Sequence, residues 1–176
     1  MEKKRVMIFI DGSNLYHGLK NVVGKTNIDF QKLAEKLCGE RDLIRTYYYN
    51  APVQREGNED NYKSQQKFFS ALDDIPYLTI RLGRLEKRGN TWVEKGVDVR
   101  LAVDMLSMGV KNLYDVAVLI SGDGDFASAI DAVKDLGKHV EVAYVSQTHQ
   151  LKTSWDKFIP LTSEYLNDCF LATYQI

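Results

Sequence analysis

The sequence predicts an α/β fold: a Rossmann-like, three-layer α/β/α domain built on a mainly parallel central sheet. Two short, uninterrupted apolar runs, at 6–10 and 116–120, suit strands that are buried on both faces of such a sheet. Segments with a helical spacing of apolar residues alternate with strand-like runs, and this alternation favours parallel strands joined by right-handed crossovers. The 176 residues are enough for one domain with a sizeable core.

In the first half of the chain each predicted element has its own local signal. The strand at 6–10 is soon followed by Ser13, which can cap a helix over 13–21. The segment 30–38 carries apolar residues at positions i, i+3, i+4, i+7 and i+8, which is the pattern of a helix with one buried face. The run TYYYNA at 46–51 is rich in β-formers and predicts a strand.

The second half repeats the alternation. A Gln- and Lys-rich segment at 61–73 has apolar residues at helical spacing, and 77–94 alternates like a β-hairpin with its turn near 88–90. The remaining predicted elements are helices at 98–108 and 126–136 and strands at 116–120 and 140–145.

The charges of the chain nearly balance, with 23 Lys and Arg against 24 Asp and Glu. This balance excludes the globally basic character of a non-specific nucleic-acid binder, so any nucleic-acid contact must use a local basic patch. The two cysteines, Cys38 and Cys169, fit no metal-binding spacing and indicate a reducing compartment. No apolar run approaches the ~20 residues of a membrane span, and we expect a cytoplasmic protein with no membrane partner.

Carboxylates follow the two most apolar strands of the predicted sheet. Asp11 comes directly after the first of them, and Asp123 and Asp125 follow the second. If these strands are neighbours, the side chains converge at the carboxyl edge of the sheet, where open parallel sheets bind ligands. Two carboxylates ~4 Å apart repel by about 4 kcal/mol at an effective dielectric of 20, so a cluster of them holds a proton or a cation. With oxygen ligands alone, Mg²⁺ or Mn²⁺ is the expected ion.

Each aspartate also has an ordinary structural explanation, because Asp favours helix caps and turns. A third segment contributes another acidic residue, Asp98, which is expected in the first turn of its helix, where the helix dipole stabilises a carboxylate. Asp104 lies ~9 Å further along that helix and about 120° around it, so Asp98 is the better candidate for a shared ion. Lys95 either binds a phosphate or stays solvated.

Three motifs carry a family resemblance: FIDGSN at 9–14, KGVD at 95–98 and SGDGDF at 121–126. Together they resemble the NYN domain of the LabA-like group, a branch of the PIN-like nuclease superfamily. The resemblance covers roughly residues 5–160 of a single domain that spans 1–176. It implies a PIN-like fold and a metal-dependent endoribonuclease that hydrolyses RNA phosphodiester bonds, with Asn14 orienting Asp11. The implied ligands of Mg²⁺ or Mn²⁺ are Asp11, Asp98, Asp123 and Asp125.

Residues that bind the RNA substrate are expected close to these motifs. The basic residues between 81 and 100 are Arg81, Arg84, Lys87, Arg88, Lys95 and Arg100. They could contact phosphates, although alternating Arg and Leu in a hairpin equally describes a solvated strand face. The candidate substrate-binding residues are Arg84, Arg88 and Lys95 in this segment and Ser13, Asn14 and Tyr16 near the first motif. Of these, Tyr16 is the candidate for stacking on a base.

Two other classes of function stay open. One is a non-catalytic RNA- or protein-binding regulator that keeps the fold and the metal pocket without turnover. The other is nucleotide-sugar transfer, which the Asp-Gly-Asp pattern at 123–125 suggests weakly while leaving the first motif unexplained. GLKNVVGKT at 18–26 lacks the spacing of a P-loop, and the loop after Asp123 lacks the Gly and Glu of an EF-hand. A homodimer is compatible with the sequence.

Overall fold

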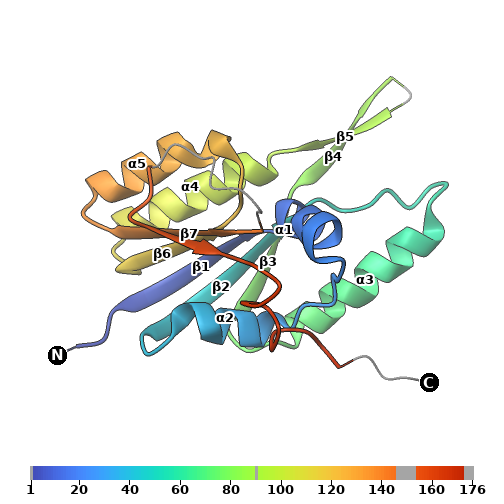
Figure 1. Cartoon of the computed structure of the whole chain (residues 1–176). Coiled ribbons are helices and arrows are strands. Elements are labelled where there is room, and N and C mark those ends of the chain that lie inside the picture. The colour runs from blue at the N-terminus through green and yellow to red at the C-terminus, as the bar shows by residue number, and fades with distance from the viewer. Residues whose placement is uncertain (1, 90, 146–153, 173–176) are drawn as a thin grey trace.

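A parallel β-sheet runs through the centre of the molecule (Figure 1). Within the residues that the computed structural model describes (2–89, 91–145 and 154–172), it has six strands in the order β3-β2-β1-β6-β7-β8. These strands are β1 (Arg5–Asp11), β2 (Asp42–Asn50), β3 (Leu78–Leu82), β6 (Val116–Ile120), β7 (His139–Tyr144) and β8 (Lys157–Pro160). The predicted fold class is therefore confirmed, and β1 and β6 are direct neighbours.

Helices cover both faces of the sheet (Figure 1). One face carries α1 (Gly12–Gly18), its π-helical continuation η1 (Leu19–Val23), α2 (Phe30–Cys38) and α3 (Glu59–Asp73). The other face carries α4 (Val97–Val110), the short 3-10 turn η2 (Gly124–Phe126) and α5 (Ala127–Asp135). These helices match the predicted ones with ends shifted by a few residues, which is the usual uncertainty of helix boundaries.

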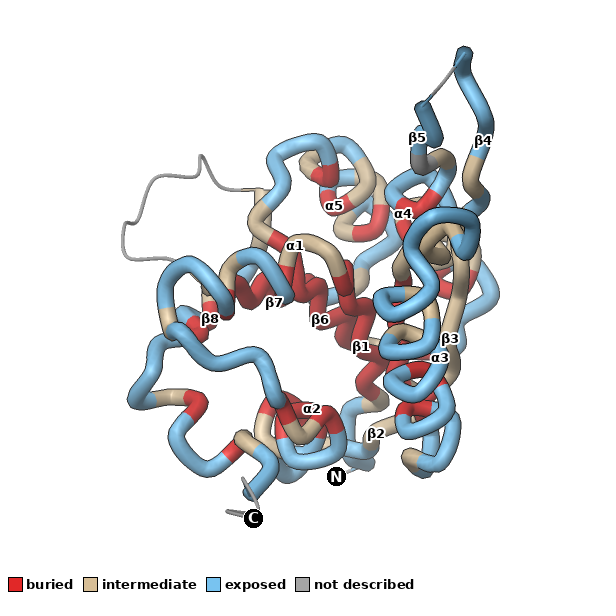
Figure 2. The backbone as a smooth tube through the Cα atoms, turned by 90° about the vertical axis from the view of Figure 1, so that its right-hand side faces the viewer, coloured by how far each residue is buried: buried red, intermediate tan, exposed pale blue. Residues whose placement is uncertain are grey.

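Two hydrophobic cores hold the layers together. Successive side chains of a strand point to opposite faces, so Ile8 and Ile10 of β1 join the core beneath α1, α2 and α3, while Met7 and Phe9 join the core beneath α4 and α5. Figure 2 shows the buried positions concentrated along β1, β6 and β7. The central strands are thus fixed on both sides, and the residues at their carboxyl ends start from a rigid platform.

The hairpin predicted over 77–94 is half wrong. Its first part is β3, which pairs in parallel with β2 at the edge of the main sheet. The hairpin itself consists of β4 (Arg84–Arg88) and β5 (Thr91–Lys95), which pair with each other and project from the body of the molecule (Figure 1). Gly83 joins the two parts, and a Cβ there would approach the carbonyl oxygen of Lys95 to 3.0 Å, so the chain can turn closely out of the sheet only with glycine at this point.

Strand β8 has no counterpart in the sequence prediction. It is four residues long and lies at the edge of the sheet, where Pro160 ends it. Proline is tolerated at a sheet edge because no neighbouring strand needs its missing N–H group. A short edge strand is exposed on one side and lacks the continuous apolar run that marks the buried strands.

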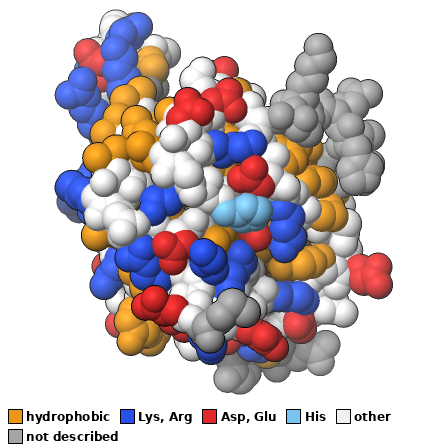
Figure 3. All heavy atoms as spheres, turned by 90° about the vertical axis from the view of Figure 1, so that its left-hand side faces the viewer, with side chains coloured by type: hydrophobic (Ala, Val, Ile, Leu, Met, Phe, Trp, Pro, Cys, Tyr) orange, Lys and Arg blue, Asp and Glu red, His pale blue; other side chains and the backbone are white. Residues whose placement is uncertain are grey.

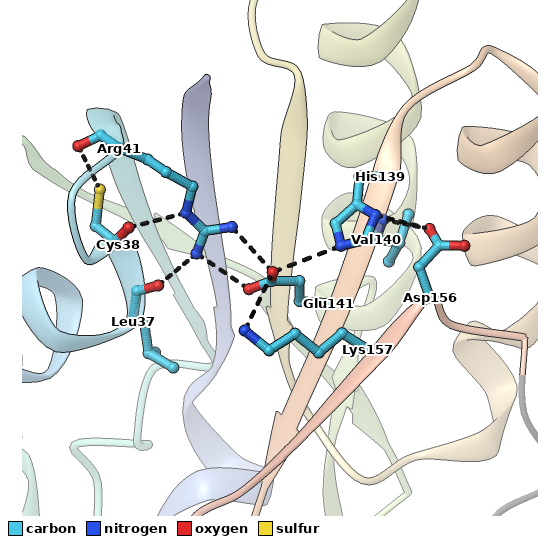
Figure 4. A network of polar contacts seen from close by, with 8 residues as sticks. All are labelled: Leu37, Cys38, Arg41, His139, Val140, Glu141, Asp156 and Lys157. Atoms are coloured by element: carbon cyan, nitrogen blue, oxygen red, sulfur yellow. Dashed lines mark hydrogen bonds and ion pairs between the residues drawn. The ribbon is translucent and has the colours of Figure 1, made fainter. Parts of the chain in front are cut away.

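A polar network ties the amino ends of the strands together (Figure 4). Glu141 of β7 is buried, and both of its carboxylate oxygens accept hydrogen bonds from the Arg41 guanidinium, at 2.9 and 3.1 Å. Arg41 also donates to the carbonyl oxygens of Leu37 and Cys38 at the end of α2. Lys157 of β8 lies 3.6 Å from the same carboxylate. The network therefore links α2, β2, β7 and β8 at the edge opposite the acidic motifs.

The surface around this network carries both signs of charge (Figure 3). Lys and Arg side chains alternate there with Asp and Glu, and one of the pairs is Arg5 with Asp115 at 2.8 Å. That guanidinium holds the pKa of the Asp115 carboxyl at about 2 through its hydrogen bonds. In the described part of the chain, no helix is long and apolar enough to cross a membrane.

Candidate active site

The acidic motifs meet in one cleft at the carboxyl edge of the sheet. Ile10 of β1 pairs with Ile120 of β6, so the residues that follow, Asp11 and Ser121, emerge side by side. The cleft has a volume of about 700 Å³. We call the turn after β1 (11–14) the first acidic turn, the turn after β6 (121–125) the second acidic turn, and the cleft between them the acidic cleft. Five predicted site residues line this cleft: Asp11, Ser13 and Asn14 on the first turn, Asp123 on the second turn and Asp98 on α4.

Asp11 is the most enclosed of these residues, with 5% of its surface exposed. Its Oδ1 accepts a hydrogen bond from the backbone N–H of Asn14 at 3.0 Å, and its Oδ2 accepts one from the Ser121 hydroxyl at 2.9 Å. Asp11 is thereby the N-cap of α1, and the prediction that Ser13 caps this helix is wrong. Both oxygens are held in place, so the carboxylate is pre-oriented toward the cleft that it lines.

Two further hydrogen bonds join the first acidic turn to the second. The side-chain oxygen of Asn14 accepts from the backbone N–H of Gly122 at 2.9 Å. The Ser121 hydroxyl oxygen accepts from the backbone N–H of Asp123 at 3.2 Å. Asn14 therefore orients Asp11 through its backbone and holds the opposite turn through its side chain, and the relative position of Asp11 and Asp123 is fixed by both turns.

The second turn presents two aspartates. Asp123 caps the 3-10 turn η2, with its Oδ1 accepting from the backbone N–H of Asp125 at 2.9 Å. Asp123 is exposed and lines the cleft, whereas Asp125 is exposed and lies outside the cleft lining. The Asp123 carboxylate thus caps η2 and also lines the cleft. Its structural role as a cap and a role in binding an ion are compatible.

Asp98 reaches the cleft from the first turn of α4. Gly96, directly before this helix, has φ +82°, a left-handed conformation that glycine adopts without strain, and it turns the chain from the β4–β5 hairpin into α4. The pKa of Asp98 is raised by burial and then by the charges of Asp11, Asp123 and Asp125. The charges of the other three predicted aspartates are therefore close enough to Asp98 to affect its ionisation.

Residues 5–163 match the NYN domain family, which covers most of the chain. The chain belongs to the NYN domain family. It is 28% identical over 167 residues to the low amplitude and bright protein LabA of Synechococcus elongatus, covering 89% of this chain and 83% of that protein. Its fold is similar to the crystal structure of a protein of unknown function from Vibrio parahaemolyticus, with a TM-score of 0.76, 20% identity and coverage of 97% and 98% of the two chains.

These similarities confirm the LabA-like resemblance drawn from the three motifs. They also agree with the PIN-like arrangement of a parallel sheet flanked by helices. NYN domains form a branch of the PIN-like nucleases, so the family assigns the chain to a nuclease lineage. The likeness to the Vibrio protein concerns the fold alone.

The possible ligand atoms in the acidic cleft suit a hard divalent cation, because they are carboxylate oxygens. Among the described residues, however, no three Asp, Glu, His or Cys side chains lie close enough together to hold a metal ion. Mg²⁺ commonly binds through one or two carboxylates and completes its shell with waters and substrate phosphates. The cleft therefore fits an ion shared with a phosphate better than an ion enclosed by protein alone.

The charge state of the cleft also favours a cation. The pKa of Asp11 is raised chiefly by burial and also by the charge of Asp123, while its hydrogen bonds from Asn14 and Ser121 act in the opposite direction. A cation in the cleft would relieve the repulsion that raises the pKa of both Asp11 and Asp98. Asp11 and Asp123 on the fixed turns, with Asp98 beside them, are the residues best placed to hold it.

The other residues considered from the sequence do not line the acidic cleft. Arg84 and Arg88 are exposed on β4, and Lys95 on β5 pairs with Glu86 at 3.0 Å. Tyr16 on α1 keeps 46% of its surface exposed. The less favoured Asp104 accepts a hydrogen bond from the Tyr49 hydroxyl at 2.9 Å and lies outside the cleft lining.

Two residues that shape the site were missed from the sequence: Ser121, which supports the cleft from outside its lining, and His17, which lines it. Ser121 is buried, with 2% of its surface exposed, and its hydroxyl supports both acidic turns. A serine between an apolar strand and an acidic turn was the available signal. His17, exposed on α1, also lines the cleft one helical turn after Ser13 and Asn14. Its i+3 and i+4 spacing from those residues was the corresponding signal.

Proposed function

We propose that this NYN domain is an Mg²⁺- or Mn²⁺-dependent endoribonuclease that hydrolyses RNA phosphodiester bonds in the acidic cleft. The observation that carries the proposal is the convergence of Asp11, Asp98 and Asp123, from three separate elements, on one cavity in which the pKa of Asp98 responds to the other carboxylates. The membership of the chain in a nuclease family supports the same conclusion.

A bound divalent ion would lower the pKa of a water molecule and offset the negative charge that develops on the phosphate. Hydrogen bonds within the protein would orient the carboxylates that hold this ion. Ser121 and the backbone of Asn14 fix both oxygens of Asp11, and the hydrogen bond from the Asp123 backbone N–H to Ser121 fixes the turn that carries Asp123. Asp98 lines the cleft beside Asp11 and Asp123, and a carboxylate there that is not bound to the ion can act as the general base.

The RNA backbone would be gripped by the β4–β5 hairpin. This hairpin projects from the body of the molecule (Figure 1), and the residues that follow β5, Gly96 to Asp98, line the cleft. Its exposed cations are Arg84, Lys87 and Arg88, and the Lys87 ammonium lies 5.9 Å from the ring centre of the half-exposed Trp92. Cations next to an exposed aromatic ring are the combination that binds single-stranded nucleic acid.

Incubating labelled single-stranded RNA with the purified protein tests the proposal. With Mn²⁺ or Mg²⁺ we expect internal cleavage, and with EDTA we expect none. Binding of RNA with no cleavage in either metal would contradict the enzyme and favour a non-catalytic RNA-binding regulator. The observation in favour of that second function is that, within the described ranges, no three Asp, Glu, His or Cys side chains lie close enough together to hold an ion.

Replacing Arg84 and Arg88 together by Ala should weaken RNA binding and flatten its salt dependence. Each lost phosphate contact lowers the slope of log K against log salt by roughly 0.7 for a single strand. The kcat at saturating RNA should stay near that of the wild type, because binding is lost equally from ground and transition states. Fluorescence anisotropy at several salt concentrations checks the slope. The Lys3→Ala, Lys4→Ala double variant is a charge-matched control at the opposite edge, and equal losses in both variants would contradict a specific role for the hairpin.

The Asp98→Asn variant should show the opposite pattern. We expect nearly normal RNA affinity and a loss of ~100-fold or more in kcat, which corresponds to about 2.7 kcal/mol of barrier. The reason is that Asn keeps the size of the side chain but neither carries its charge nor accepts a proton. Single-turnover kinetics with saturating protein measures this directly, and a kcat close to wild type would remove Asp98 from the reaction.

A further inference from the structure

A second cavity adjoins the acidic cleft. It has a volume of about 470 Å³, within the ~300–1,000 Å³ typical of small-molecule sites. Ser13 and His17 line both cavities, so the second one opens beside the acidic cleft across α1. Its other walls come from Thr26 in the loop before α2, from Phe30 of α2, from β2 and the segment after it, and from α3.

Aromatic rings dominate this second cavity. Phe30, Tyr48 and Phe68 contact one another edge to face, with ring centres 5.4 to 5.9 Å apart. Phe68 nevertheless keeps 36% of its surface exposed. On α1, Tyr16 lines the same cavity and keeps 46% of its surface exposed. Two of the aromatic side chains that line the cavity, Tyr16 and Phe68, thus retain accessible surface, while aliphatic and uncharged polar residues complete its walls.

The walls of the second cavity are held firmly. The Gln65 amide donates to the carbonyl oxygen of Ala51 at 2.9 Å and accepts from the backbone N–H of Val53 at 2.7 Å. Gly12 allows the Tyr48 ring to lie against the start of α1, because a Cβ at this position would collide with that ring and approach the Tyr49 carbonyl oxygen to 2.8 Å. These contacts connect α3 to the segment after β2 and let α1 lie close to β2, so neighbouring walls of the cavity are joined directly.

The second cavity also differs from the acidic cleft in charge. No Asp, Glu, Lys or Arg is found among the described residues that line it. Its neutral aromatic lining does not attract a phosphate, but it suits a flat, uncharged ring that can stack on Tyr16 and Phe68. The acidic cleft next to it suits a phosphate accompanied by a cation.

We propose that the second cavity binds one unstacked nucleobase of single-stranded RNA, next to the phosphate that lies in the acidic cleft. This inference rests on the proposed function for the placement of that phosphate. Stacking of bases on aromatic side chains is the general way in which proteins hold single strands. Tyr48 lines this cavity, and its hydroxyl accepts a hydrogen bond from Asn50 at 3.2 Å and still has its own hydrogen to donate to the base.

Binding of two strands of equal length and charge tests the inference without any cleavage. One is a fluorescein-labelled oligouridine 12-mer, and the other is a ribose–phosphate 12-mer that lacks bases. In EDTA the wild type should bind oligouridine at least tenfold more tightly than the abasic strand, which is ~1.4 kcal/mol. Tyr16→Ala and Phe68→Ala should each reduce this preference several-fold and leave the affinity for the abasic strand unchanged.

Matched variants separate stacking from folding. Tyr16→Phe keeps the ring and should keep the preference, and Tyr77→Ala removes an exposed aromatic side chain outside the cavity and should change neither affinity. Tyr16 is half exposed on a helix surface, so its replacement should not unfold the protein. Equal wild-type affinity for both strands, or a preference that survives in the Tyr16→Ala, Phe68→Ala double variant, would overturn the inference. Cleavage with Mn²⁺ but without base preference would refute the nucleobase pocket alone, and base preference without cleavage would refute the nuclease alone.

Discussion

Asp11→Asn is expected to abolish metal-dependent RNA cleavage, with kcat falling at least ~1,000-fold, or about 4 kcal/mol of barrier. Asp11 is the enclosed carboxylate whose two oxygens are already oriented by Asn14 and Ser121. Asn can accept the backbone hydrogen bond of Asn14 but brings no negative charge to a divalent ion. Gel analysis of labelled RNA cut in Mn²⁺ checks the result, and Asp131→Asn on the exposed surface of α5 is the matched control.

The same variant should not be less stable than the wild type when metal is removed by EDTA. The pKa of Asp11 is raised in the folded protein, chiefly by burial, so ionised Asp11 opposes folding. The stabilising effect of the protonated form is complete below the ordinary pKa of Asp and is lost as pH rises through the raised pKa. At pH 7 the Asn variant should therefore melt at the same temperature or higher, with the difference shrinking in acid. A clearly lower melting temperature at pH 7 would mean that the hydrogen bonds of the Asp11 carboxylate stabilise the fold by more than its burial as an ion costs.

Arg41→Ala is expected to cause the largest loss of stability. The change removes the bidentate partner of the buried Glu141 and leaves a carboxylate that is 3% exposed with only the more distant His139 and Lys157, at 3.5 and 3.6 Å. Breaking a buried ion pair from one side typically costs about 3 kcal/mol or more. For a chain of this length that corresponds to a fall of roughly 6–12 °C in melting temperature. Thermal unfolding followed by circular dichroism measures it.

The control for this prediction removes the unpaired charge. Glu141→Gln in the Arg41→Ala background should recover part of the lost stability, since a neutral amide tolerates burial better than an isolated carboxylate. Lys157→Ala should change the melting temperature little, because its ammonium is more than half exposed. A melting temperature of Arg41→Ala within a degree of wild type would show that the network in Figure 4 contributes little to stability.

Much of the fold could be predicted from the sequence because its signals are local. The apolar runs of β1 and β6 and the helical stripe of α2 reflect burial on two faces or on one, and each is readable within about ten residues. β3 was assigned to the hairpin because it is half-buried and alternates, and a parallel edge strand has the same pattern as one arm of a hairpin. Only the pairing partner, which is distant in sequence, distinguishes the two.

The candidate site shows the same division. Asp11 and Asp123 are marked by their place after buried strands, and the adjacency of β1 and β6 brings the two turns together as expected. The role of Ser121 depends on a hydrogen bond to a residue 110 positions away, and that of Arg41 on a carboxylate 100 positions away. Such contacts depend on the assembled tertiary structure, and the local sequence marks at most the residue type, not its partner.

The position of a bound ion tests the central claim most directly. Crystals grown with Mn²⁺ and a non-cleavable RNA analogue would locate the metal by its anomalous scattering. We predict a peak inside the acidic cleft, ~2.1 Å from a carboxylate oxygen of Asp11 or Asp123 and in contact with a phosphate oxygen of the RNA. Mn²⁺ bound only elsewhere on the protein, with RNA present and the cleft without a peak, would contradict the account.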